Sequence, residues 1–71
     1  MRRYLIVIER AANNFAAYSP DLPGCVATGA TKEEVESNMQ EAIRMHLAGL
    51  EEDRLPIPEG GSIAEYVTVE D

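Results

Sequence analysis

The sequence predicts a small α+β domain with the element order βββαβ. Three observations indicate this class: three short β-rich segments separated by turn residues, one long segment with helical periodicity, and a final β-rich segment after a Pro/Gly-rich connection. The short segments predict an antiparallel meander, and the helix allows the chain to cross over to a fourth strand parallel to the first. With 71 residues, the chain is expected to form one domain over residues 1–71.

The first three strands are predicted at residues 3–9, 15–19 and 25–30. Asn13 and Asn14 tolerate positive φ and predict the hairpin turn between the first two strands. The second strand must end at Pro20, because Pro20 and Pro23 lack backbone donors, and Gly24 permits the positive φ of a tight turn.

The first strand carries apolar side chains toward both faces of the predicted sheet. Tyr4, Ile6 and Ile8 alternate with Leu5 and Val7. One helix can cover only one of these faces, and a contiguous exposed apolar patch is unusual on a monomer. We therefore expect a homodimer or higher oligomer, or a standing interface with another protein.

The helix is predicted to begin at a capping box. The Thr31 hydroxyl can accept from the Glu34 amide, while the Glu34 carboxylate can reach back to the Thr31 amide. One apolar stripe with a 3.6-residue repeat follows, formed by Val35, Met39, Ala42, Ile43, His46, Leu47 and Leu50. The acidic residues 51–53 fray its end, residues 55–61 connect, and residues 63–69 have the composition of the fourth strand.

The charge balance restricts the partners of the chain. Thirteen acidic residues against six basic ones give a formal net charge of −7, which argues against binding nucleic acid and favours a basic partner. The single cysteine, Cys25, cannot form an internal disulfide, and no run of about 20 apolar residues could span a bilayer. We expect a cytoplasmic protein with no membrane association.

No residue pattern predicts catalysis, a metal site or a cofactor. His46 lies on the apolar stripe without a convergent partner, which favours a packed helix residue over a catalytic one. Cys25 has no adjacent cation to lower its pKa and is interpreted as a small buried hydrophobe. The carboxylates gather at the helix ends, where capping and solubility explain them, so we do not expect an enzyme.

One ordered set of residues resembles the HicB-like family of bacterial and archaeal antitoxin domains over nearly the whole chain. The Pro-Asp-Leu-Pro-Gly-Cys turn at residues 20–25 leads into Gly29, Thr31 and Glu34, which open the helix. Further matches are Asn38, Glu41, Ala42, Ile43, Ile57 and Pro58. The resemblance implies a truncated RNase H-like fold, with structural roles for Pro20, Leu22, Pro23, Gly24, Cys25, Gly29, Thr31 and Glu34.

The resemblance also implies a function. Members of this family typically neutralise HicA toxins, which are small basic ribonucleases, by covering their active surface. The acidic residues Glu9, Asp21, Glu51, Glu52 and Asp53 are candidates for that contact, although Asp21 could instead bond to amides within its turn. Many such antitoxins carry a C-terminal DNA-binding domain; none is expected after the last strand here, so direct nucleic-acid binding is not expected.

Two alternatives to the antitoxin hypothesis stay open at this point. The first is a stand-alone oligomeric interaction or small-ligand-binding module that has the same fold and no toxin partner. The second is a metal-dependent nuclease, which would need several carboxylates to converge. The sequence favours the antitoxin, because its acidic charge suits a basic enzyme.

Overall fold

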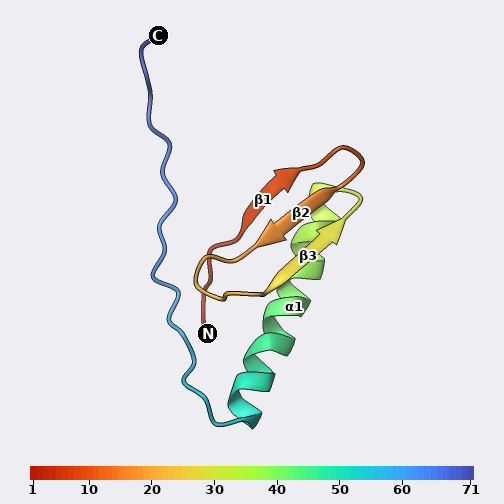
Figure 1. Ribbon diagram of the computed structural model, residues 1–71, viewed down its shortest axis with the longest axis vertical. Coiled ribbons are helices and arrows are strands. Elements are labelled where there is room, and N and C mark those ends of the chain that lie inside the picture. The colour runs from red at the N-terminus through yellow and green to blue at the C-terminus, as the bar shows by residue number, and fades with distance from the viewer.

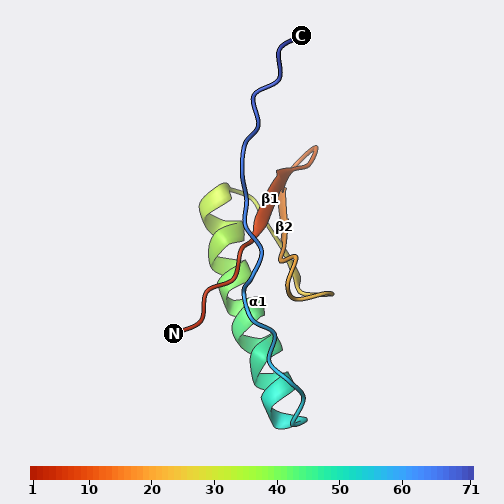
Figure 2. The same ribbon diagram turned by 90° about the vertical axis from the view of Figure 1, so that its left-hand side faces the viewer.

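The computed structural model describes residues 1–71 and contains one antiparallel sheet followed by one helix. The strands are β1 (Val7–Arg10), β2 (Phe15–Tyr18) and β3 (Val26–Gly29), paired in the order β1-β2-β3, and the helix α1 spans Lys32–Glu52. α1 lies across one face of the sheet, so the fold has two layers (Figures 1 and 2). The predicted α+β class, the meander and the helix are confirmed.

β1 begins four residues later than predicted. Val7 pairs with Tyr18, so residues 3–6 could be paired only by residues beyond the end of β2. Pro20 has no backbone donor and ends the pairing there. Beyond the last backbone pair, a side-chain hydrogen bond links the two segments: the Ser19 hydroxyl donates to the Leu5 carbonyl at 2.9 Å.

The strand register separates the two faces of the sheet. Ile8, Ala17 and Ala27 are cross-strand neighbours, and Ala17 belongs to the buried core, so this row faces α1. Because side chains alternate along a strand, the next row points away from the helix. That row consists of Val7, Tyr18 and Val26.

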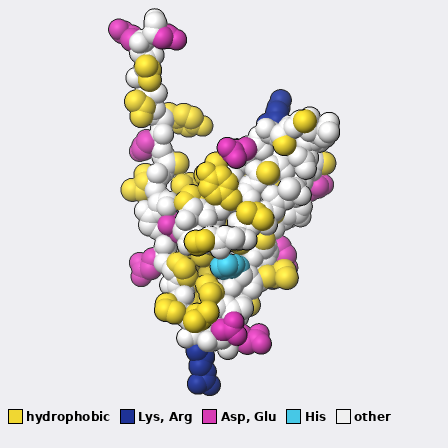
Figure 3. All heavy atoms as spheres, viewed as in Figure 1, with side chains coloured by type: hydrophobic (Ala, Val, Ile, Leu, Met, Phe, Trp, Pro, Cys, Tyr) yellow, Lys and Arg dark blue, Asp and Glu magenta, His cyan; other side chains and the backbone are white.

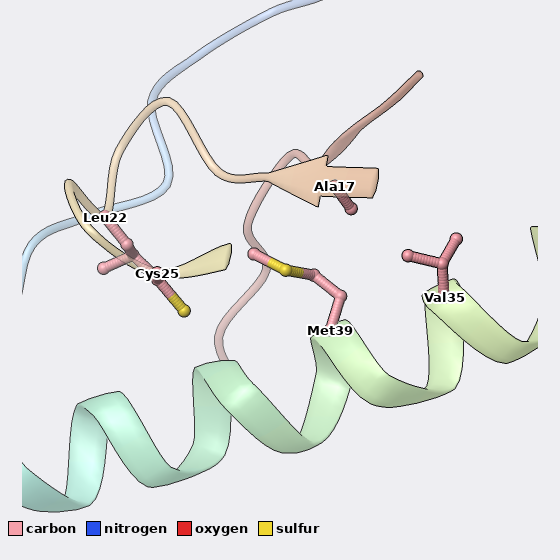
Figure 4. Close-up of a cluster of buried hydrophobic side chains, with 5 residues drawn as sticks. All are labelled: Ala17, Leu22, Cys25, Val35 and Met39. Carbon is pink, nitrogen blue, oxygen red and sulfur yellow. The ribbon is translucent and has the colours of Figure 1, made fainter. Parts of the chain in front are cut away.

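The buried core joins the β2–β3 turn to the first half of α1. Its five side chains are those of Ala17, Leu22, Cys25, Val35 and Met39, and Figure 4 shows the turn and helix residues pointing toward one another. Leu22, Val35 and Met39 have no exposed surface. The partly buried residues around this core are Tyr4, Ile6, Ile8, Phe15, Ala27, Ala42, Ile43 and Leu47.

α1 is longer than the sheet that it covers. Its 21 residues extend roughly 31 Å, whereas a four-residue strand extends roughly 13 Å. Burial along the predicted apolar stripe falls accordingly, from buried Val35 and Met39 to half-buried Leu47 and Leu50. The C-terminal half of α1 therefore projects beyond the sheet (Figure 1).

The helix does not fray at its C-terminus as the sequence suggested. Arg54 adopts a positive φ of 57°, and its amide donates to the Glu51 carbonyl at 3.1 Å. The Leu55 amide donates to the Leu50 carbonyl at 2.8 Å, which completes a Schellman arrangement. These bonds satisfy the last carbonyls of the helix and turn the chain back toward the sheet.

The predicted fourth strand is wrong for the isolated chain. Residues 62–71 make no backbone–backbone hydrogen bond and belong to no sheet. Residues 63–71, hereafter the tail, instead extend away from the body of the domain (Figures 1 and 2). β-rich composition reflects a fit to a pleated, half-buried surface, and this chain alone places no strand against the tail.

Candidate partner-binding surface

The β2–β3 turn holds the residues that the sequence marks as scaffold. Leu22 is fully buried and Cys25 is 4% exposed, so the turn contributes directly to the core. The Leu22 amide donates to the Ser19 carbonyl, and the Cys25 amide donates to the Leu22 carbonyl, both at 3.1 Å. Gly24 has φ of +84°, a conformation that other residues rarely adopt.

The start of α1 also has the predicted cap, with one difference. The Glu34 amide donates to the Thr31 hydroxyl at 3.0 Å. The Glu34 carboxylate, however, accepts from the amide of Ala30 at 2.9 Å, rather than from that of Thr31. Thr31 is extended, with φ −129° and ψ 164°, and the carboxylate thus reaches one residue farther back.

Gly29, the last residue of β3, lets the sheet approach the helix closely. A Cβ at this position would lie 2.6 Å from the Val35 nitrogen. The Asn38 side-chain amide adds a second link by donating to the Thr28 carbonyl at 2.8 Å. The start of α1 is therefore fixed against β3.

Asp21 makes long-range bonds rather than bonds within its turn. Its two carboxylate oxygens accept from Ser62, from the backbone amide at 3.2 Å and from the hydroxyl at 2.9 Å. The sequence could not show this pairing, because 41 residues separate the two positions. Asp21 therefore anchors the chain just before the tail.

Two further contacts hold the connection between α1 and the tail. The Tyr4 hydroxyl donates to the Pro58 carbonyl at 2.6 Å. Gly60 lies so close to the N-terminal segment that a Cβ there would overlap the Arg3 carbonyl oxygen. Together with the Asp21–Ser62 bonds, these contacts, hereafter the anchor contacts, fix where the tail leaves the domain.

The five acidic candidates for partner binding do not converge. Glu9 lies near the β1–β2 turn, whereas Asp21 lies in the β2–β3 turn at the opposite end of the sheet. Glu51, Glu52 and Asp53 form a separate group at the end of α1, beyond the sheet. The structure therefore divides the candidates into three places.

The group at the end of α1 is the least neutralised. Glu51, Glu52 and Asp53 are exposed and form no salt bridge; the last turn of the helix holds no basic residue, and Arg54 follows it. The negative end of the helix dipole lies at the same place. Their charges and the dipole therefore add, and the negative potential there attracts cations.

The rest of α1 is also acidic on its exposed side. Glu33, Glu36 and Glu41 are exposed, and only two basic residues, Lys32 and Arg44, lie on the helix. Lys32 is 3.6 Å from Glu36, and Arg44 is 3.0 Å from Glu41. Such exposed pairs contribute little to stability, so we interpret this side as a solvated acidic face.

The outer face of the sheet carries an apolar row that sequence reasoning found only in part. The alternation in β1 identified Val7, but Tyr18 and Val26 became its neighbours only through the observed register. Tyr18 is 43% exposed and Val26 is 64% exposed. Hydrophobic side chains accordingly gather on the face shown in Figure 3.

The Cys25 thiol is buried and forms no disulfide. Burial raises the pKa of the Cys25 thiol, which keeps it protonated and weakly nucleophilic. His46 is half-buried and lines a shallow hollow with Cys25, Val26, Ala42 and Met45. No three side chains of the metal-binding types come together. The helix α1 also lacks the apolar composition that a membrane-crossing helix needs.

Comparison with known families decides which class of domain this is. Residues 4–71 match the family described as "HicB_like antitoxin of bacterial toxin-antitoxin system". The chain belongs to the HicB-like antitoxin family.

Proteins from a phage, a bacterium and an archaeon resemble this HicB-like domain. A UPF0150 protein of Helicobacter pylori is 45% identical over 49 residues, which cover 69% of the chain and 68% of that protein. UPF0150 protein Ta0767 of Thermoplasma acidophilum is 34% identical over 68 residues, covering 94% of the chain and 96% of that protein.

The phage relative is a longer protein. It is a 14.9 kDa protein from the rep-hol intergenic region of Haemophilus phage HP1, 36% identical over 64 residues. These residues cover 90% of the chain but 48% of the relative, so the HicB-like domain spans about half of its length. No solved structure matches the chain at a significant level.

Proposed function

We propose that this HicB-like domain binds a small, basic HicA-type ribonuclease toxin and blocks the access of RNA to it. Membership of the antitoxin family is the observation that carries the proposal. The net charge of −7 supports it, because an acidic domain competes with RNA for a cationic surface. The proposed action takes place in the cytoplasm and requires no catalysis, cofactor or direct nucleic-acid contact by the domain.

Within this proposal, the C-terminal end of α1 attracts the toxin. Of the acidic candidates, Asp21 is occupied by Ser62, whereas Glu51, Glu52 and Asp53 have no partner. Their negative charges lie at the negative end of the helix dipole, which is an unfavourable arrangement in the free domain. A cationic partner relieves that repulsion, so the arrangement favours the complex over the free domain.

Glu9 contributes less to this proposed interaction. It is a single charge at the other end of the sheet, whereas residues 51–53 bring three carboxylates together. The Arg10 guanidinium lies 5.4 Å from the centre of the Phe15 ring, on the opposite face of the sheet from Glu9. We therefore assign the main steering role to residues 51–53.

The first experiment tests partner binding and inhibition directly. The tagged chain is used to capture proteins from its native lysate at low and high salt. We expect a small basic protein that is released by salt. Its ribonuclease activity is then measured with and without the chain. Full activity in the presence of excess chain would contradict the antitoxin proposal.

Charge variants then test the steering surface. The triple change Glu51→Gln, Glu52→Gln and Asp53→Asn should slow association and weaken its dependence on salt. The matched control removes the same charge from the exposed side of α1, through Glu33→Gln, Glu36→Gln and Glu41→Gln. If both triple variants associate equally fast, the end of α1 has no special role in steering.

A self-associating module is the second candidate, and one observation favours it. The tail exposes apolar residues that a monomeric domain normally covers. Should lysate capture return only the chain itself, self-association would become the leading function. The two candidates are compatible, because a dimer can also bind a toxin.

A further inference from the structure

The tail has the composition of a β-strand but pairs with no sheet. Its apolar residues are almost fully exposed: Ile63 is 83% exposed, Tyr66 104%, Val67 82% and Val69 76%. None of its backbone amides or carbonyls bonds to another backbone group. Figure 3 shows the tail standing clear of the body of the domain. The residues best suited to a sheet therefore have no neighbour within the chain.

The sheet also has an open edge, where no further strand is paired. β1 pairs only with β2, so its second edge is open. Natural proteins protect such edges with Pro, Lys, bulges or a covering element. Residues 4–8 read Tyr-Leu-Ile-Val-Ile and contain no charge and no proline, and the two charged residues of β1, Glu9 and Arg10, lie at its C-terminal end. This edge is suited to accept another strand.

The anchor contacts place the tail next to that edge but not on it. The tail leaves the domain beside residues 3–6, then runs in the same direction as β1 while remaining separate from it (Figures 1 and 2). An open hollow of about 500 Å³ lies at this point. It is lined by Arg3, Tyr4, Leu5, Ile6, Gly60 and Ser62.

We propose that the tail of a second copy occupies this position, so that two chains exchange their C-terminal strands. Residues 63–69 of each copy pair with the open edge of β1 in the other copy, and the exchange is reciprocal about a two-fold axis. Strand addition of this kind gains affinity from main-chain hydrogen bonds. It uses the same surface twice, as a two-fold interface requires.

The orientation of the two-fold axis sets the direction of the added strand. We place the axis perpendicular to the strands, and such an axis makes the two tails antiparallel to each other. Because each tail runs in the direction of its own β1, the incoming tail is antiparallel to the β1 that receives it. The exchange therefore extends the antiparallel pattern of the three-stranded sheet.

Charge favours this direction over pairing within one chain. Antiparallel addition brings Glu70 and Asp71 of the incoming tail to the start of β1, near Arg2 and Arg3. Parallel pairing with the tail's own β1 would carry the same carboxylates toward the β1–β2 turn. There the only cation, Arg10, is already held over the Phe15 ring. The inference does not depend on the antitoxin proposal.

The first test is the mass of the full chain in solution. Light scattering after size-exclusion chromatography should give two chains per particle at micromolar concentration. Val67→Pro removes a backbone donor from the middle of the tail and fixes φ there, and should weaken dimerisation on the order of 100-fold. Val67→Thr keeps the donor and the β-branched shape, and should remain dimeric. A monomeric wild type, or a fully dimeric Val67→Pro, would overturn the exchange.

The second test distinguishes exchange from closure within one chain. Isotopically labelled and unlabelled chains are mixed after unfolding and refolding, and isotope-filtered NOEs are recorded. We expect contacts between Val69 of one chain and residues 4–6 of the other. If contacts between the tail and β1 occur only within one chain, the proposal is wrong. This wild-type measurement decides the question even if Val67→Pro fails to fold.

Discussion

Gly29→Ala is a direct test of how closely β3 and α1 approach. The added methyl would lie 2.6 Å from the Val35 nitrogen, 2.9 Å from the Val35 Cα and 3.0 Å from the Glu34 carbonyl carbon. All three are backbone atoms, so no side-chain rotation can relieve the overlap. α1 must therefore move away from β3, although Val35 is fully buried in the core.

The expected cost is a large share of the stability of the domain. Overpacking of this kind costs typically about 1–3 kcal/mol. A core of this size rarely supplies more than about 3–5 kcal/mol of net stability. We expect Gly29→Ala to lower the free energy of unfolding by about 2 kcal/mol.

Gly49→Ala provides a matched control with the opposite sign. Gly49 lies within α1, and a Cβ there would meet nothing within 4 Å. Since alanine favours a helix over glycine by about 0.8–1.0 kcal/mol, this variant should be more stable than the wild type.

Urea denaturation followed by circular dichroism measures both variants, at one protein concentration so that self-association affects each equally. The close approach of β3 and α1 would be refuted if Gly29→Ala were as stable as the wild type while Gly49→Ala gained stability.

Three further predictions concern the cap, the anchor and the thiol. Thr31→Ala should cost about 1 kcal/mol in urea denaturation, whereas Thr31→Ser should keep most of the cap; equal losses would argue against a capping hydroxyl. Asp21→Ala should cost about 1–2 kcal/mol and speed hydrogen exchange at the Ser62 amide, because it removes both acceptors of Ser62; unchanged exchange would show that the anchor is weak. The Cys25 thiol should react with a disulfide reagent more slowly in the native chain than in urea. Its pKa is higher in the folded than in the unfolded state, so stability should fall as the pH rises above about 8.5, and Cys25→Ser should abolish that part of the fall.

Local signals in the sequence predicted most of the fold, whereas features that depend on distant residues were missed. The Thr31 cap and the stripe through Val35 and Met39 depend on residues three or four positions apart, and the structure contains both. The start of β1 and the state of the tail depend on whether another strand lies alongside. Composition cannot supply that information, because β-rich residues describe a fit to a neighbour rather than the presence of one.

For the candidate partner-binding surface, too, the sequence predicted local features and missed those that depend on distant residues. The sequence located every acidic residue but not the Asp21–Ser62 pairing, which joins positions 41 residues apart. It also placed Val7 on one of the two apolar faces of the first strand, without identifying its neighbours Tyr18 and Val26. Those two could have been found from the strand registers, had the β1–β2 and β2–β3 turns been assigned their lengths in advance.

The order in which the core residues occur along the chain has a consequence for synthesis. The five buried apolar residues all lie between Ala17 and Met39, so the core is complete before the last third of the chain has been translated. Since folding follows the N-to-C order of synthesis, the sheet and the start of α1 can assemble while the ribosome still holds the tail. The open edge of β1 is then exposed on each nascent chain before its own C-terminal strand is released. Neighbouring ribosomes on one messenger would bring such chains close together, which favours pairing between newly made copies.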